Sequence, residues 1–225
     1  MEIKLVILQT EEINEMKRFY VDIFGFPLLK EDKNSFRIAV GSSELEFTSE
    51  NVEGNPYYHF AFNIPSNLFR EAKSWVKEKV KLSVEDGEDE AYFSFFSAYA
   101  LYFYDPSGNI VEFISREASE EGTQPFSIES VLNISEIGLT VDDAIAAGTK
   151  LKEIGINVRD NDPLSQTSLN FMGEKSKGIF IILNQPGRRW IFSDKISAIY
   201  PLEIQTTDGS KIVVNNDHLL EIFKD

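Results

Sequence analysis

The sequence predicts an α+β fold in which a strand–helix–three-strand (βαβββ) unit occurs twice in the first half of the chain. Two observations carry this prediction. The same order of apolar patterns begins near residue 3 and again near residue 57, with one helical period among strand-like runs each time. A turn containing Pro106 and Gly108 also separates the apolar runs 99–104 and 110–114, which is typical of a β-hairpin.

The elements of the two units follow in the same order. The first unit predicts a strand over residues 3–9, a helix over 11–24 that ends at Gly25, and extended runs at 27–30, 36–40 and 44–48. The second predicts a strand over 57–64 and, after Ser66 as N-cap, a helix over 67–80. Its extended runs are 81–84, 91–96, 99–104 and 110–115. Residues 1–117 are therefore predicted to form a two-unit domain.

A polar, acidic segment, residues 117–127, is the predicted linker to the second half. Residues 128–225 predict a third, divergent βαβββ unit with a strand at 131–141, a helix at 142–154, and strands at 169–172 and 178–183. Two runs joined by Asp208-Gly209, residues 200–206 and 211–215, then predict a hairpin. A short helix over residues 217–223 is expected to end the chain.

The composition excludes several classes of function. The chain has 37 acidic and 22 basic residues and a formal charge of −15, so nucleic acid and anionic membranes are not expected partners. It contains no cysteine, which excludes disulfides, thiolate metal sites and thiol catalysis. The first residues lack a cationic start and a long apolar run, so we expect a soluble, cytoplasmic protein.

Four features are candidates for chemistry. Glu112 is a single carboxylate within an apolar strand, and it must either face solvent or be stabilised by a cation or hydrogen-bond donors. His59 opens a strand and is either a ligand or an imidazole satisfied by its neighbours. The turn Arg188-Arg189-Trp190 could bind a carboxylate or phosphate, or balance nearby acids at the surface. The aromatic residues between 92 and 104 fit either a strand core or an apolar cup for a flat ligand.

Three segments resemble motifs of the vicinal-oxygen-chelate superfamily, which includes glyoxalases, fosfomycin and bleomycin resistance proteins, and extradiol dioxygenases. Residues 17–26, KRFYVDIFGF, resemble its "FY…LGF" helix end, and residues 105–113, DPSGNIVEF, resemble its "DPxGNxxEF" hairpin. Residues 59–62, HFAF, resemble the "HxAF" strand that opens a second module. The resemblance spans residues 1–116, and the third unit resembles a further module only weakly.

The resemblance implies a cup formed by two modules with a divalent metal at its base. The glyoxalase-type ligand set then falls on Leu5, Glu46, His59 and Glu112. Leu5 departs from the pattern, because a histidine or glutamine normally stands there. The implied metal site is therefore Glu46, His59 and Glu112, with Zn, Ni, Mn or Fe(II) as the metal. Glu112 is also the candidate for catalytic proton transfer.

Glu136 stands at the first ligand position of the third unit, but the last strand of that unit, residues 178–183, carries no carboxylate. We therefore expect the third unit to be structural, either covering the sheet of the first two or forming a homodimer contact. Two functions remain open from the sequence. One is a divalent-metal-dependent lyase, isomerase or dioxygenase acting on a small oxygenated substrate. The other is a metal-free protein that sequesters a small molecule, as bleomycin resistance proteins do.

Overall fold

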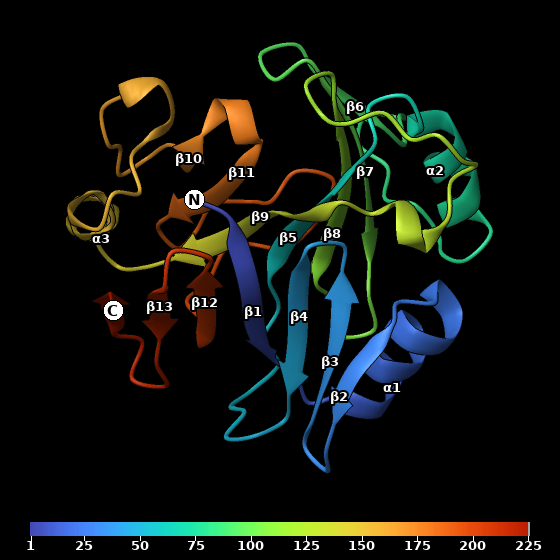
Figure 1. Ribbon diagram of the computed structural model, residues 1–225. Coiled ribbons are helices and arrows are strands. Elements are labelled where there is room, and N and C mark those ends of the chain that lie inside the picture. The colour runs from blue at the N-terminus through green and yellow to red at the C-terminus, as the bar shows by residue number, and fades with distance from the viewer. Residues whose placement is uncertain (225) are drawn as a thin grey trace.

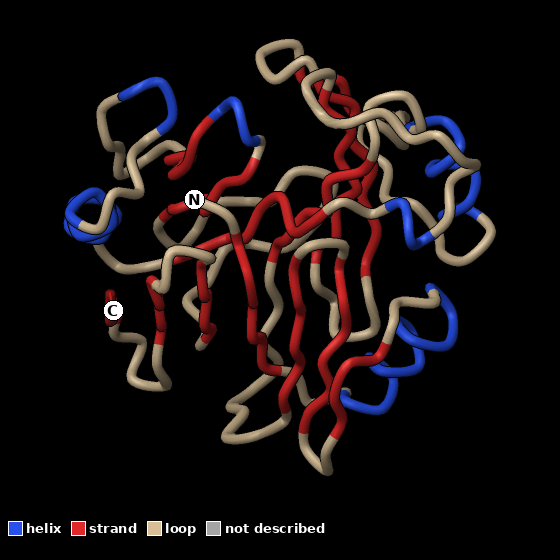
Figure 2. Tube along the Cα trace, in the orientation of Figure 1, coloured by secondary structure: helices blue, strands red, loops and turns tan. Residues whose placement is uncertain are grey.

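The computed structural model describes residues 1–224, and within them the strands form two seven-stranded sheets (Figures 1 and 2). The first sheet has the order β14 (Leu220–Lys224), β13 (Ser210–Val214), β12 (Leu202–Thr206), β1 (Ile3–Gln9), β4 (Ser43–Thr48), β3 (Ser35–Val40) and β2 (Leu28–Glu31). The second has the order β10 (Asn170–Glu174), β11 (Ile179–Asn184), β9 (Asn133–Thr140), β5 (His59–Ile64), β8 (Ile110–Arg116), β7 (Ala98–Tyr104) and β6 (Ala91–Phe93).

The helices are few and short. They are α1 (Ile13–Lys17), which continues into the π-helical turns of η1 (Arg18–Phe24), α2 (Phe69–Lys77) and α3 (Ala144–Glu153), together with the 3₁₀ turns η2 (Ile128–Ser130), η3 (Arg159–Asn161) and η4 (Lys175–Lys177). Figure 1 shows α1 and α2 on one side of the molecule and α3 on the opposite side. No helix within residues 1–224 is long and apolar enough to cross a bilayer.

The predicted α+β class with paired βαβββ units is confirmed. In the first unit, β1 lies parallel to β4 and antiparallel pairing joins β4 to β3 and β3 to β2. The second unit repeats this arrangement, with β5 parallel to β8 and with β7 and β6 beyond it. The third unit has β9 parallel to β11 but only β10 and β11 after its helix, which begins where the Asp143 carboxylate accepts from the Ile145 and Ala146 amides, each at 3.0 Å.

The pairing between units differs from the expected one. The resemblance implied that the first two units together form one cup. Instead, β1 pairs antiparallel with β12, and β5 pairs antiparallel with β9. The first sheet therefore joins the first unit to the C-terminal strands β12, β13 and β14, and the second sheet joins the second unit to the third. Both sheets contain strands from before and after residues 117–127. The third unit supplies three of the seven strands of the second sheet and does not cover the sheet.

The helix predicted over residues 217–223 is wrong. These residues form a turn and the edge strand β14, which pairs antiparallel with β13. The Asn215 side chain accepts hydrogen bonds from the Asp217 and Leu219 amides, each at 3.0 Å, and so shapes the turn. Leu220 and Ile222 alternate with more exposed neighbours, a period of two that suits a strand.

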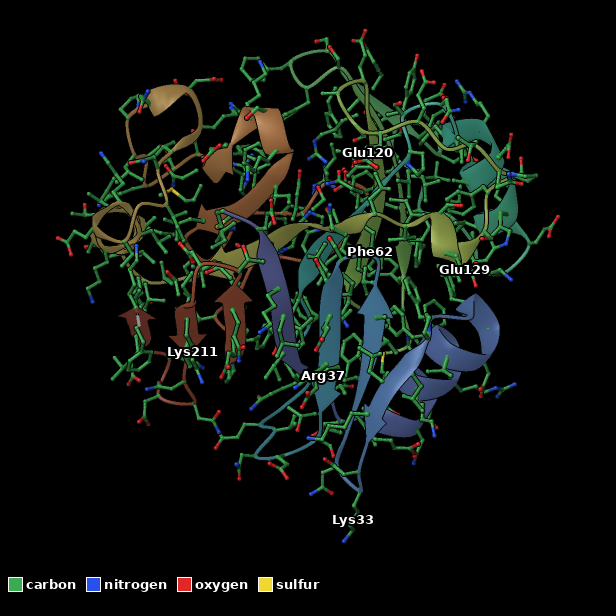
Figure 3. All side chains as sticks on the ribbon, viewed as in Figure 1. Lys33, Arg37, Phe62, Glu120, Glu129 and Lys211 are labelled. Atoms are coloured by element: carbon green, nitrogen blue, oxygen red, sulfur yellow. The ribbon has the colours of Figure 1, made fainter. Side chains whose placement is uncertain are left out.

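The main core lies between the two sheets. Figure 3 shows Phe62 of β5 near the centre of the molecule and Lys33 at its periphery. The Phe62 ring packs 5.5 Å from the Phe60 ring and 5.8 Å from the Phe113 ring, measured between centroids. Phe47 of the first sheet reaches Phe60 across the core at 6.5 Å. Because side chains alternate along a strand, the residues between these phenylalanines point to the opposite face of the second sheet.

Candidate functional site

The opposite face of the second sheet carries a cluster of three buried ionisable residues. His59 stands on β5, Glu112 on β8 and Glu136 on β9, which are neighbouring strands in the order β9-β5-β8. One potential ligand atom from each lies within 4.8 Å of the others, and the residues are 5%, 2% and 4% exposed, respectively. The strand register creates the cluster, because Ala61, two residues after His59, lies opposite both Glu112 and Glu136.

His59 is oriented as a neutral imidazole with one free nitrogen. Its Nδ1 lies 3.0 Å from the Ile110 carbonyl oxygen, and a carbonyl can only accept, so Nδ1 carries the proton. Burial lowers the pKa of His59, which favours this neutral form. The remaining nitrogen, Nε2, then presents a lone pair 3.5 Å from Oε2 of Glu112. A backbone carbonyl that fixes the tautomer is the usual support of a metal-ligating histidine.

The two carboxylates have unequal surroundings. Burial, followed by the negative charge of Glu136, raises the pKa of Glu112 well above its ordinary value, although Arg116 and the Tyr102 hydroxyl act in the opposite direction. Glu136 forms an ion pair with the buried guanidinium of Arg116. With both carboxylates ionised, the cluster holds two negative charges against one positive charge. Such a buried excess needs a proton or a cation.

Arg116 is fixed by further contacts at the end of β8. Its guanidinium donates to the Ser135 hydroxyl at 2.6 Å and to Oδ1 of Asn63 at 2.5 Å. The backbone of Gly178 approaches its stem so closely that a Cβ there would lie 2.8 Å from Cδ of Arg116. Gly178 also has a φ of +60°, so the position favours glycine on both counts. The single cation of the cluster is thus held in one orientation.

A cavity of about 250 Å³ opens above the cluster. Its walls are mostly aromatic and aliphatic, contributed by Phe93, Phe96, Ile114, Leu169, Phe171, Ile182, Trp190 and Ile191. The Trp190 ring lies 4.8 Å from the His59 ring, and Phe192 stacks on Tyr102 with centroids 4.8 Å apart and planes 11° apart. The segment containing these two rings therefore covers the ionisable floor.

The structure brings together two of the three predicted metal ligands. His59 and Glu112 meet, but Glu46 lies on β4 of the first sheet, where its carboxylate pairs with Arg37 at 2.6 Å. The reason is the pairing of β1 with β12, which keeps the first unit away from His59. Leu5 stays with Glu46 in that sheet.

Glu136 completes the cluster, although its unit was expected to be structural. The signal was present, since Glu136 was recognised at a first ligand position. The missing information was the pairing of β9 with β5. The strand register also identifies the residue that would occupy a fourth ligand position of the site. Glu112 stands two residues beyond the partner of His59, and the same step from Phe180, the partner of Glu136, leads to Ile182.

The donor set fits a divalent metal. One imidazole nitrogen and two carboxylates suit Zn, Mn, Fe(II) or Ni, and the excess negative charge favours a cation. Since Ile182 cannot ligate, His59, Glu112 and Glu136 would leave positions open toward the cavity, as catalytic metal sites do.

Comparisons with known proteins found one matching family model and several similar solved structures. Residues 134–188, which run from β9 through β11, match the family model described as toxoflavin-degrading enzyme. Similar solved structures include a lactoylglutathione lyase from Agrobacterium tumefaciens, at 19% identity over 50% of this chain and 91% of that chain, with a TM-score of 0.41. A glyoxalase family protein from Enterococcus faecalis matches at 24% identity over 50% of this chain and 96% of that one, again with a TM-score of 0.41.

A third similar structure is a glyoxalase/bleomycin resistance protein/dioxygenase from Alicyclobacillus acidocaldarius. It has 14% identity over 52% of this chain and 92% of that chain, with a TM-score of 0.42. The search of curated proteins found no match. Each of these three structures corresponds to about half of this chain.

Proposed function

We propose that this protein is a divalent-metal-dependent enzyme that acts on a small, oxygenated, flat molecule bound in the cavity of the second sheet. The observation that supports this most is the convergence of His59, Glu112 and Glu136, with one negative charge in excess, at the floor of an aromatic cavity. The match of residues 134–188 to a family described as toxoflavin-degrading supports a small molecule as substrate.

The residues of the floor have separate tasks in this proposal. His59, held by the Ile110 carbonyl, and the Glu136 carboxylate, held by Arg116, are fixed before any ligand arrives. A divalent ion bound there would supply Lewis acidity toward substrate oxygens. Burial raises the pKa of Glu112, so it holds a proton more readily than an ordinary carboxyl group and is the candidate to accept and return a proton. Trp190 and Phe192 keep bulk water from the floor. A lyase, isomerase or dioxygenase would each use these elements.

Metal retention tests this proposal directly. Equilibrium dialysis against Mn, Fe(II), Ni and Zn, followed by elemental analysis, should give one equivalent of a divalent ion per chain. His59→Ala and Glu136→Gln should each weaken that binding by about tenfold or more, since each removes a ligand. Glu46→Gln is the matched control, because it removes a carboxylate at the corresponding position of the first sheet and should leave binding unchanged. Absence of binding for every metal, or equal loss in the control, contradicts the proposal.

A second function is favoured by one specific observation. A proton on Glu112 would neutralise the cluster without any metal, because Arg116 already balances Glu136. The cavity would then sequester a flat ligand without transforming it. In that case a chelator should leave both the melting temperature and the ligand affinity unaltered. The metal-dependent hypothesis instead requires the chelator to lower the melting temperature and the ligand affinity.

A further inference from the structure

We infer that the cavity selects flat aromatic ligands that carry an anionic group at one end, with the ring inside and the anion at the rim beside Arg188. The inference deepens the proposed function by naming its substrate class, and it rests on the same cavity but not on the metal. Three observations carry it: the aromatic walls, an unpaired cation at the rim, and the polarity of the floor.

The walls fit a planar ring. Phe96 and Phe171 lie 5.2 Å apart between centroids, and Trp190 faces the floor from the covering segment. Aromatic rings attract a flat ligand through offset-stacked and edge-to-face contacts. A cavity of about 250 Å³ lies at the small end of ligand pockets, so a ligand of roughly one or two rings fits it.

The rim carries two arginines with different surroundings. Arg189 is engaged, because its guanidinium pairs with Glu85 and donates to the Ser193 carbonyl at 2.8 Å. Arg188 lines the same cavity, yet its guanidinium pairs with no carboxylate of residues 1–224 and makes only a 3.4 Å contact with the Thr167 carbonyl. In a chain with a net charge of −15, an exposed arginine without a carboxylate partner at a cavity mouth is a free site for an anion.

The backbone holds Arg188 at that position. Its amide donates to the Ser197 hydroxyl at 3.0 Å, and its carbonyl accepts from the Ser197 amide at 2.6 Å. Binding an anion there requires little rearrangement of the main chain. Most of the interaction free energy between Arg188 and the anion therefore contributes to the preference for an anionic ligand.

The floor sets the direction of the ligand. Glu112 and Glu136 repel a ligand anion from the deep end, while Arg188 attracts it at the mouth. The deep end instead suits a neutral oxygen or the bare edge of the ring. The predicted ligand class is therefore an aromatic carboxylate, or an aromatic ring with a comparable anion, in which any hydroxyl or carbonyl lies at the end opposite the anion.

The test uses two probes of the same shape, 2-naphthoate and the neutral 2-naphthamide, in isothermal titration calorimetry with the full chain. In EDTA at about 50 mM salt, where charges are weakly screened, naphthoate should bind about tenfold more tightly than naphthamide. Arg188→Gln should abolish this preference while leaving naphthamide binding unchanged. Arg18→Gln, which removes an exposed arginine of η1 far from the cavity, is the matched control and should keep the preference.

Each other outcome overturns the inference. Equal binding of the two probes, or failure of both to bind, removes the predicted selectivity. If Arg188→Gln still binds naphthoate more tightly than naphthamide, a group other than Arg188 binds the carboxylate. A preference that appears only with added metal places the carboxylate on the floor, which would refute this inference while supporting the metal site. Conversely, loss of metal binding with an intact Arg188-dependent preference would refute only the proposed metal chemistry.

Discussion

Replacing Arg116 with methionine is expected to destabilise the folded protein by about 3–5 kcal/mol, because it removes one partner of a buried ion pair. Arg116 is 5% exposed, and its loss leaves the Glu136 carboxylate beside Glu112 without a cation. Methionine fills a similar length, so cavity formation adds little to this free energy. For a chain of this size, about 2–4 °C per kcal/mol corresponds to a drop of roughly 10 °C in melting temperature.

Urea denaturation at neutral pH measures the change in the free energy of unfolding. Arg70→Met is the matched control, because the Arg70 side chain is 68% exposed in its pair with Glu90 and its loss should cost less than about 1 kcal/mol. The double variant Arg116→Met/Glu136→Gln should regain at least about half of the loss, since it removes the unpaired charge.

Added divalent metal should also restore stability to Arg116→Met, because a bound cation replaces the missing positive charge. A loss below about 1 kcal/mol in Arg116→Met would refute the reasoning, since a buried carboxylate would then tolerate the absence of its partner. A double variant as unstable as the single one would also refute it, because the loss would then come from packing rather than from charge.

Three further changes test other parts of the structure. Ile182→His should tighten metal binding by about tenfold, as it supplies a ligand at the fourth position; unchanged affinity in dialysis would contradict the register argument. Glu85→Ala should expose Trp190 to acrylamide quenching, because Glu85 anchors both Arg189 and the Phe192 amide; quenching equal to that of the unaltered protein would show that the segment is held elsewhere. Burial raises the pKa of Asp105 from 3.8 to about 6, so its contribution to stability is present at pH 4 and lost as pH rises through 6. Relative to Asp105→Asn, the unaltered protein should lose about 2 kcal/mol of unfolding free energy between pH 4 and 7, and a constant difference in urea titrations would contradict this.

Local patterns were sufficient to predict the units of the fold but not their partners. The strands β1 and β5 are both apolar first strands, and each could hydrogen-bond with any free strand edge. Their actual partners, β12 and β9, lie far along the chain, and the choice between them depends on packing of whole units rather than on periodicity. The helix prediction for residues 217–223 was wrong for a related reason. This segment is too short to form a stable helix alone, and its pairing with β13 decides its structure.

The site residues within one unit could be predicted from the sequence, whereas the residue from another unit could not. His59 and Glu112 belong to one unit, and two motifs of that unit, residues 59–62 and 105–113, identified them. Glu136 comes from another unit, and its own last strand offered Ile182 in place of a carboxylate, which argued against it. Only the register between β5 and β9 reveals that a three-donor site forms across the two units.

The first sheet contains a counterpart of the site, and the comparison explains why function is assigned to only one of them. Leu5 and Glu46 stand in the same register as His59 and Glu112, and Glu203 lies opposite Ile7 as Glu136 lies opposite Ala61.

In the first sheet, Arg37 pairs with both Glu46, at 2.6 Å, and Glu44, at 2.8 Å, and Lys211 pairs with Glu203 at 2.8 Å. The cations also lie closer to solvent, where such pairs bind no further ion strongly. In the second sheet two buried acids share the single cation of Arg116, and an imidazole replaces the leucine. The same backbone pattern therefore carries partly solvated ion pairs in the first sheet and a buried negative excess in the second, and the buried excess is the one that a bound metal or proton stabilises.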